Sequence, residues 1–466
     1  MSAEGLNKWI AEWYEKNDKA INDFMADIWA HPETGLKTFY AAKASAAFAK
    51  AQGFTKVLAT RAGCGIKEDP DANSLIAEYG SGRPVIGIVG ELDALPGLGS
   101  KNVDHHEPIE GPGHGCGHCL IAGSAMGGAC ALRYAMEKEG IQGTVRLIEA
   151  PAEEIGRGKA LLAQDGVFKD LDMAIMWHPG NRDFSAEPQH QLCVMSATFE
   201  FHGKSAHAAG SPWMGRSALD AVQLMNMGCE FLREHVKKEC FIHYQILNGG
   251  GAPNVVPDYA SVKYLCRALS TETVQDLYDR VVKCAEGAAH MTDTKVDVKL
   301  RFIMPYFYIN MPLSRHLHDV SLRIPPFEYT DEEYAFARNV ISDYLGEPGP
   351  EAKEDILPGI RQEFNGFDEK TTCTDAADMS YFCPTVHMHG GGEVRLAPSH
   401  HWAVTACAGT SIGRKAALFA GKVLAQGAYE ALLDPKIIEE SWAYQKESNI
   451  IDYYEMYGKL DIVEED

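Results

Sequence analysis

Apolar and polar positions alternate with two different periods along the first 190 residues. Residues 17–30 and 38–52 carry apolar side chains at helical spacing, and the second run ends at Gly53, a common helix terminator. Short apolar runs at 74–79 and 84–90 predict buried strands. A further helix and two strands are predicted at 120–138, 144–150 and 173–177. Apolar strands alternating with helices predict an α/β domain, with a mixed sheet covered by helices on both faces.

The pattern changes near Gln191. Four strands and two helices follow in the order βαββαβ, at 191–202, 216–235, 241–247, 255–268, 271–291 and 295–303. This order predicts a ferredoxin-like α+β insert. Helical patterns near 331–345 and 409–432 then return to the first domain. We therefore expect a discontinuous catalytic domain, 1–190 and 306–466, interrupted by a lid or dimerisation domain at 191–305.

Composition narrows the class of protein. The chain has 466 residues and a formal net charge of −22, which disfavours binding to nucleic acid or anionic lipid. No apolar run approaches the roughly 20 residues of a membrane span. Twelve scattered cysteines in so long a chain are typical of a reducing, cytoplasmic setting rather than of a disulfide scaffold.

Candidate ligands cluster where the predicted strands end. Glu91 and Asp93 follow one strand, Glu153 and Glu154 follow the next, and His178 follows the third. Because ligands bind beyond the carboxyl ends of strands in open α/β sheets, these side chains are expected at one rim. Each alone has a simpler interpretation: an acidic pair is usually a solvated turn, and a single His is usually a hydrogen-bonded structural residue.

The segment His114-Gly115-Cys116-Gly117-His118 precedes the predicted helix at 120–138. Glycines permit backbone angles that would let the Cys116 thiolate and the His118 imidazole reach one metal pair. Thiolate, imidazole and carboxylate are ligands of zinc and its neighbours. By itself the segment fits equally well a glycine-rich turn with a buried Cys and a capping His.

The combination is more specific than its parts. His400 and His401 lie in a loop before another helix, whereas His105 and His106 lie in an acidic stretch that indicates a solvated loop. One Cys, three His and one Glu would supply five ligands to two divalent ions. An adjacent free Glu could then take a proton from the attacking water.

At this point the motifs match a known family. The chain resembles the dinuclear amidohydrolases of the aminoacylase and carboxypeptidase G superfamily, nearest to the branch with auxin-conjugate hydrolases and the p-aminobenzoyl-glutamate hydrolases. The matching segments are Gly-Glu-Leu-Asp-Ala-Leu-Pro at 90–96, His-Gly-Cys-Gly-His at 114–118, Pro-Ala-Glu-Glu at 151–154, Trp-His-Pro at 177–179, and the stretches at 201–213, 248–257 and 374–380. The resemblance covers nearly the whole chain.

The resemblance implies a role for each matching residue. It assigns the metal ligands, with Cys116 at the bridging position, to Cys116, His118, Glu154, His178 and His400. It makes Glu153 the general base and His114 a supporting residue, and it prefers His400 to His401. His207 and Asn254 match residues that reach a neighbouring subunit's active site, which implies a homodimer through the insert at 191–305.

The implied activity is hydrolysis of an amide bond in a small N-acyl or N-aroyl amino acid, such as p-aminobenzoyl-glutamate, or in a dipeptide. The implied cofactor is two divalent ions, zinc or manganese, with cobalt and nickel as alternatives. Cys119 departs from the family pattern, and Arg157 and Arg267 are candidates for the substrate carboxylate. Two rivals stay open: a catalytically silent relative that acts as a binding or partner subunit, and a thiol hydrolase that uses Cys116 as its nucleophile.

Overall fold

The chain forms two compact units. The computed structural model describes residues 5–448 and 450–458, with only the backbone at 368–371. Unit 1 comprises the chain up to Gln189, Tyr308–Glu369 and Asp378–Ile450; unit 2 comprises His190–Phe307, Lys370–Ala377 and the stretch from Ile451. The continuous part of unit 2 compares with the 191–305 expected from sequence. The two short returning stretches have no counterpart in that expectation.

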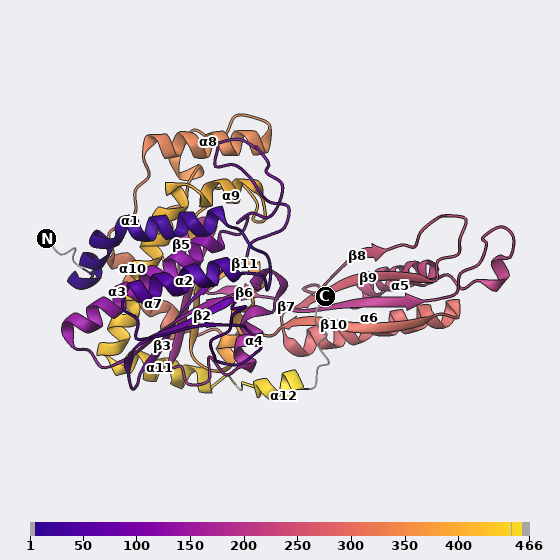
Figure 1. Cartoon of the computed structure of the whole chain (residues 1–466), viewed down its shortest axis with the longest axis horizontal. Coiled ribbons are helices and arrows are strands. Elements are labelled where there is room, and N and C mark those ends of the chain that lie inside the picture. The colour runs from indigo at the N-terminus through magenta and orange to yellow at the C-terminus, as the bar shows by residue number, and fades with distance from the viewer. Residues whose placement is uncertain (1–4, 449, 459–466) are drawn as a thin grey trace. The chain divides into compact units, whose positions relative to one another are not determined.

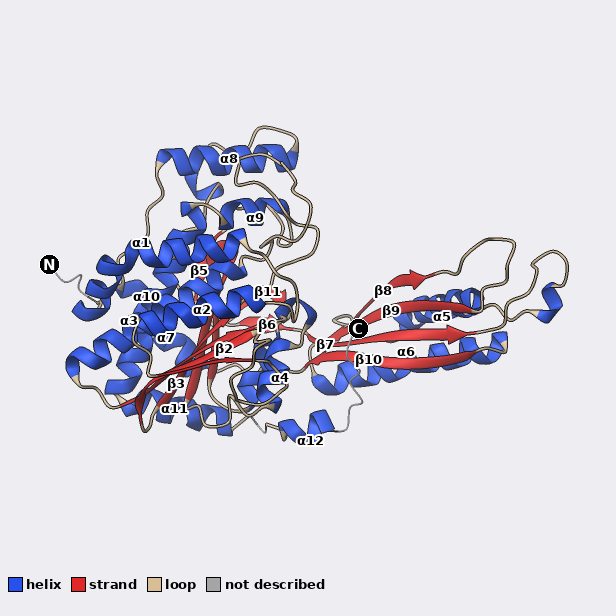
Figure 2. Ribbon diagram, in the orientation of Figure 1, coloured by secondary structure: helices blue, strands red, loops and turns tan. Residues whose placement is uncertain are grey.

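Unit 1 is built on a six-stranded mixed sheet in the order β1-β2-β4-β3-β5-β12 (Figure 2). Strands β4, β3, β5 and β12 are parallel, whereas β2 pairs antiparallel with both β1 and β4. The strands are β1 (Lys56–Thr60), β2 (Ser74–Ser81), β3 (Val85–Glu91), β4 (Gly143–Ala150), β5 (Met173–Ser185) and β12 (Thr385–Gly392). Every residue of β3 is buried, which explains its uninterrupted apolar sequence.

Helices flank this sheet (Figure 1) and confirm the predicted fold class. They are α1 (Lys8–Ala30), α2 (Phe39–Ala51), α3 (His118–Glu139), α4 (Gly158–Gln164), α7 (Met311–Arg323), α8 (Asp331–Leu345), α9 (Trp402–Ala408), α10 (Ser411–Leu433) and α11 (Pro435–Lys446). Helix α3 packs along α10 so closely that a Cβ at Gly128 would lie 3.0 Å from the Gly421 carbonyl oxygen. Among the described helices, α3 is the one with the length and hydropathy of a membrane span, and 94% of that window is buried in the protein, as in a core helix.

Unit 2 carries a four-stranded antiparallel sheet in the order β10-β7-β9-β8, with helices α5 and α6 packed against β7 and β9 (Figure 2). Its elements are β7 (Cys193–His202), α5 (Ala218–Leu232), β8 (Phe241–Asn248), β9 (Tyr259–Ala268), α6 (Thr271–Thr292), β10 (Lys295–Met304) and the short α12 (Tyr453–Gly458). Strand order and connectivity are those of a ferredoxin-like fold, as predicted. A third sheet pairs β6 (Gln189–Gln191) with β11 (Asp368–Thr372).

Strand β12 has no counterpart among the predicted elements. Two histidines and three glycines interrupt its apolar pattern, because it borders the site rather than filling the core. Strand β5 also continues to Ser185 instead of ending at Trp177, so His178 lies within the strand. Helix α1 begins at Lys8, nine residues before the predicted start, where the Asn7 side chain accepts hydrogen bonds from the Trp9 and Ile10 N–H groups.

Candidate metal centre

Potential metal-ligating atoms gather in unit 1 beyond the ends of β3 and β4 and beside β5. Three groups among the described residues bring their ligand atoms within 4.8 Å of one another: Cys116–His118–His178, Cys116–Glu154–His400 and Glu91–His118–Glu153. The structure thus brings together all five residues that the family resemblance implied as ligands, together with the implied base. Cys116 belongs to two of the groups, and His118 also belongs to two.

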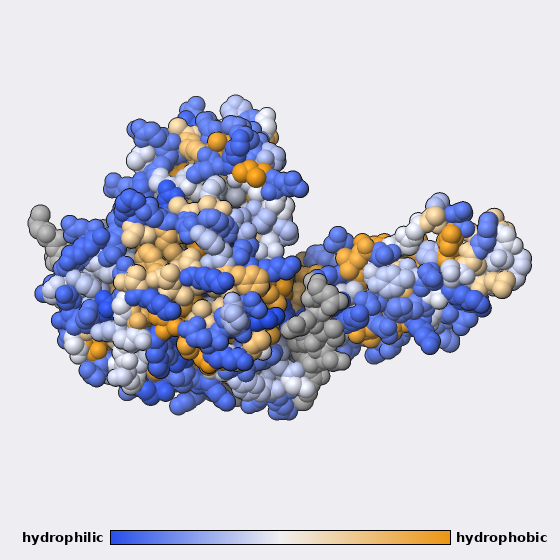
Figure 3. All heavy atoms as spheres, in the orientation of Figure 1, coloured by the Kyte–Doolittle hydropathy of each residue, from blue (hydrophilic) through white to orange (hydrophobic). Residues whose placement is uncertain are grey.

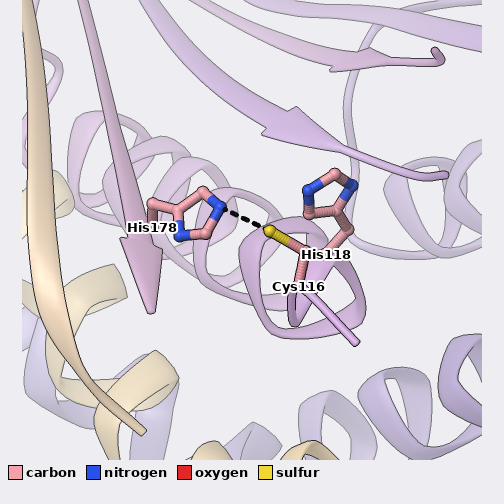
Figure 4. Close-up of side chains that lie close together, drawn as sticks. All are labelled: Cys116, His118 and His178. Carbon is pink, nitrogen blue, oxygen red and sulfur yellow. Dashed lines mark hydrogen bonds between the residues drawn. The ribbon is translucent and has the colours of Figure 1, made fainter. Parts of the chain in front are cut away.

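Cys116 and His118 flank a glycine that shapes the turn into α3 (Figure 4). Gly117 has φ 79°, and a Cβ there would lie 2.6 Å from Pro179 Cγ, so both conformation and space require glycine. Cys116 Sγ lies 3.3 Å from Nε2 of His178. His178 Nδ1 donates to the Pro179 carbonyl oxygen at 2.7 Å, which leaves the Nε2 lone pair directed at this cluster.

Asp93 holds three parts of the site together. Its carboxylate lies 3.3 Å from Nδ1 of His118 and accepts the backbone N–H groups of Glu153 and Glu154, each at 3.1 Å. Because Asp93 takes the Nδ1 proton, Nε2 of His118 is the atom that faces the carboxylates. Asp93 therefore supplies the support for His118 that the Cys119 departure had left in question.

Glu153 and Glu154 lie in a 3-10 turn (Glu153–Ile155) that follows β4. The preceding Ala152 adopts φ 56°, a left-handed conformation that turns the chain sharply. Oε1 of Glu154 lies 3.7 Å from Nε2 of His118, and Oε2 lies 3.4 Å from Nε2 of His400. Oε2 of Glu153 lies 4.0 Å from Nε2 of His118. The two adjacent carboxylates thus face the same imidazole from different positions.

The two neighbouring histidines of the last loop do different things. His400 adopts φ 58°, and its N–H donates to the Gly115 carbonyl oxygen at 3.0 Å, which fixes the loop against the Cys116 turn. His401 instead caps α9, where its Nδ1 accepts the Ala403 N–H, and its ring packs edge-on against Tyr344. The geometry therefore places His400, and not His401, beside Glu154.

A buried ion pair borders the centre. Lys159 Nζ lies 2.6 Å from Oε1 of Glu91, and both side chains are 0% exposed. The other Glu91 oxygen lies 3.5 Å from Nε2 of His118. Burial alone would raise the pKa of Glu91, but the charges of Lys159 and His118 outweigh it and hold the pKa at about 2. Glu91 is therefore an ionised carboxylate inside the protein.

Burial and mutual repulsion also shift the proposed ligands. Burial, reinforced by the Asp93 charge, raises the pKa of Glu154 to about 7. Burial and the Glu154 charge raise the pKa of the Cys116 thiol well above its usual range. Burial and the charge of His118 lower the pKa of His400. Without a cation, the site therefore retains protons on groups that would ligate metal in their deprotonated form.

The residues fit a metal on their own chemistry. Nε2 of His118, Oε1 of Glu154 and Oε2 of Glu91 are buried atoms without a hydrogen-bond partner, and all three belong to these clusters. Unpartnered buried polar atoms are rare in native proteins and usually mark an ion, a water or a catalytic site. Thiolate, imidazole and carboxylate together are a donor set for zinc and other transition ions.

Two residues implied for catalysis lie in unit 2. His207 and Asn254 are exposed on adjacent loops, joined by a bridge between His207 and Val255. His207 Nδ1 accepts the N–H groups of Ala209 and Gly210 at 3.2 and 3.0 Å. The proton of the neutral ring consequently resides on Nε2, which makes the exposed nitrogen a hydrogen-bond donor.

Other sequence candidates lie outside the clusters. Cys116 and Cys119 have Cys-x-x-Cys spacing, but Cys119 is in the hydrophobic core, where burial raises its pKa to about 12. His105 is 55% exposed, in keeping with a solvated loop, whereas the His106 ring stacks on Trp402. Arg267 donates to Cys373 Sγ within unit 2.

Sequence reasoning missed some neighbours of the centre. Lys159 and His387 carried no strand-end signal, because one lies in the short α4 and the other in the unpredicted β12. The His387 ring packs edge-on to His178 with centroids 5.8 Å apart, and burial lowers its pKa to about 3. His114 contacts the Ile28 carbonyl oxygen at 3.1 Å, a structural role behind the ligand turn.

Comparisons with known proteins agree with this site. Residues 87–401 match the model of peptidase family M20/M25/M40. The chain is 35% identical to the second of the two p-aminobenzoyl-glutamate hydrolase chains of Escherichia coli, over 93% of this chain and 94% of that protein. It is 29% identical to the mouse Xaa-Arg dipeptidase, over 75% and 70%. A dinuclear metal-binding peptidase from Bacillus subtilis shares the fold at 19% identity, with a TM-score of 0.57 over 89% of this chain and 99% of that one. The chain therefore belongs to peptidase family M20/M25/M40 and is a metal-dependent hydrolase, as the motifs predicted.

Proposed function

We propose that the protein hydrolyses the amide bond of a small N-acyl or N-aroyl amino acid, or of a dipeptide, at a centre that holds two divalent ions. One observation carries the proposal: Cys116 Sγ belongs to two donor groups at once, one with His118 and His178 and the other with Glu154 and His400. A shared thiolate between two donor sets is the arrangement that two neighbouring ions require.

In this proposal Cys116, His118, Glu154, His178 and His400 hold the ions. The ions supply a polarised substrate carbonyl and a water of lowered pKa. Glu153 accepts the proton of the attacking water and returns it to the leaving amine, while Asp93 holds the Glu153 backbone in place. All six positions are filled, which argues against a silent partner subunit. The raised pKa of the Cys116 thiol argues against a thiol nucleophile, which must ionise to react.

The substrate class rests on the relatives. One is named for p-aminobenzoyl-glutamate and another for Xaa-Arg dipeptides, and both compounds present an amide bond next to an amino acid carboxylate. The test is a screen of N-aroyl glutamates, N-acyl amino acids and dipeptides on the full chain, with zinc or manganese added. Release of a free amino acid would support the proposal. Binding of substrate and metal without release would favour the silent relative.

We further propose a cytoplasmic location. The described part of the chain contains all twelve cysteines, and none of them forms a disulfide there. Unpaired thiols in this number are typical of a reducing compartment.

We also propose that the protein is a homodimer formed through unit 2. Edge strand β8 and helix α5 expose large apolar side chains, including Leu247 at 52% and Phe231 at 70% (Figure 3). An edge strand with exposed apolar residues is a surface that a partner chain can cover. In such a dimer, His207 and Asn254 would serve the centre of the other copy, with His207 Nε2–H donating to the oxyanion.

Mixing two inactive variants tests this sharing. We expect His207→Ala and Glu153→Gln each to form nearly inactive homodimers. After the two are unfolded together and refolded, about a quarter of wild-type activity should return, because half of random dimers are mixed and each has one intact site. The activity of the mixture, compared with that of each variant refolded alone, is the measurement. A mixture no more active than its parts would contradict shared sites.

Metal affinity should depend on pH. Because the pKa of Glu154 is raised to about 7 and that of Cys116 is raised further, metal binding must displace protons. Affinity is therefore highest above these pKa values, and below pH 7 it should fall about tenfold per pH unit for each proton displaced. Titration calorimetry at pH 6 and pH 8, in buffers of different ionisation enthalpy, measures both affinity and proton release. Equal affinity at the two pH values would contradict this prediction.

A further inference from the structure

Lys159 is one of the largest fully buried side chains of the protein, and its ammonium lies 2.6 Å from Glu91 Oε1. A buried lysine is costly unless its charge is paired, so the contact with Glu91 is what allows Lys159 to lie there. Lys159 comes five residues after Glu154 and lies in the first turn of α4. It therefore joins the loop that carries the two adjacent glutamates to the end of β3.

That loop fixes Lys159 tightly. The Arg157 and Gly158 N–H groups both approach the Ala152 carbonyl oxygen, at 3.1 and 3.3 Å. A Cβ at Gly158 would lie 1.6 Å from the Pro151 carbonyl oxygen, so no other residue fits without moving the chain. The position of the ammonium is therefore set by the same backbone that positions Glu153 and Glu154.

Glu91 faces two ways. Oε1 contacts Lys159, whereas Oε2 has no hydrogen-bond partner and lies 3.5 Å from Nε2 of His118, the atom that faces the carboxylates. A lysine charge this close to a cation site would repel a divalent ion, since charges interact strongly where water is excluded. The Glu91 carboxylate, which lies between Lys159 and His118, cancels that repulsion.

We propose that Glu91 and Lys159 are positioning residues of the metal centre: Lys159 anchors the Glu153–Glu154 loop to β3, and Glu91 neutralises Lys159 so that the anchor does not expel the metal. The inference rests on the proposed function, because it takes the clusters to bind divalent ions. It gives the two members of one ion pair opposite effects on metal affinity, which a purely structural pair would not have.

The test is a double-mutant cycle on the full chain, with the Kd for Zn²⁺ measured by competition with a chromogenic chelator. Glu91→Gln leaves the Lys159 charge unopposed and should weaken binding about 10- to 100-fold. Lys159→Met keeps the length of the side chain without its charge and should bind Zn²⁺ at least as tightly as wild type. The double variant should recover most of the loss caused by Glu91→Gln.

Glu149→Gln is the matched control. Glu149 is a fully buried glutamate on the neighbouring β4, and burial raises its pKa well above the usual range, so glutamine replaces a neutral group of the same shape. Its Kd should stay at the wild-type value, and thermal unfolding of each metal-free variant would verify folding. If Glu91→Gln does not fold, the Lys159→Met result decides, because weaker binding in that variant would overturn the inference.

Wild-type affinity in a folded Glu91→Gln variant, or a double variant as weak as Glu91→Gln, would also overturn it. A wild-type protein that binds no divalent ion would overturn the proposed function and this inference together. If wild type binds metal and hydrolyses substrate while the cycle shows no coupling, the inference alone fails.

Discussion

Glu153→Gln should lower kcat for amide hydrolysis by about 10²- to 10⁴-fold while the metal content stays that of wild type. Glutamine has the shape of glutamate but cannot accept a proton at neutral pH. The hydrogen bond from the residue 153 backbone N–H to Asp93 does not involve the side chain, so the loop should keep its form. Steady-state kinetics, with metal analysis of the same sample, measures both quantities.

Glu154→Gln is the matched control for this substitution. It changes the adjacent carboxylate, whose oxygens lie beside both His118 and His400, and should reduce metal content as well as activity. The two variants therefore separate a proton acceptor from a ligand. Near-normal turnover by Glu153→Gln, or loss of metal from it, would show that Glu153 is not the base.

Removal of the metal should abolish hydrolysis completely, and addition of a divalent ion should restore it. Without cations the cluster contains an ionised Glu91 and protonated or repelling ligands, and nothing else among the described residues of the site would polarise a carbonyl. Dialysis against a chelator, followed by separate addition of zinc, manganese, cobalt and nickel, is the measurement. The ion that restores the highest activity at stoichiometric amounts identifies the preferred metal under those conditions.

The same experiment separates the metal mechanism from a thiol mechanism. A hydrolase that uses Cys116 as its nucleophile would keep its activity in the chelator and lose it to a thiol-alkylating reagent. Bound metal should instead protect Cys116 from alkylation, because its sulfur would be coordinated and it is already buried. Activity that survives complete metal removal would rule out the proposed mechanism.

Much of the fold follows from local sequence patterns. Strands β3 and β4 are continuous apolar runs, and helices α5, α6 and α8 have side-chain caps at their first turns, so hydrophobic period and capping residues agree. Strand β12 was missed because its histidines and glycines serve the site at the expense of the strand pattern. The return of 370–377 and 451–458 to unit 2 depends on long-range contacts that no local pattern encodes.

The candidate site was predictable to the extent that its residues sit in recognisable motifs. Cys116, His118, Glu153 and Glu154 follow strand and turn signals, and the family resemblance then added His400. The supporting groups were harder to assign from sequence. The roles of Asp93 and Lys159 depend on which backbone N–H and which carboxylate each one meets, and those contacts arise only when β3, β4 and α4 are assembled.

The division of unit 1 by unit 2 has a consequence for synthesis on the ribosome. Four of the five proposed ligands lie before residue 180, but His400 comes more than 200 residues later, after the whole continuous part of unit 2. Strand β12, which pairs with β5, also arrives only then. A nascent chain that has just completed Phe307 therefore presents most of a cation site, open at the place that His400 and β12 will close. Unit 2 can fold while unit 1 waits, and the metal centre is among the last features that the growing chain completes.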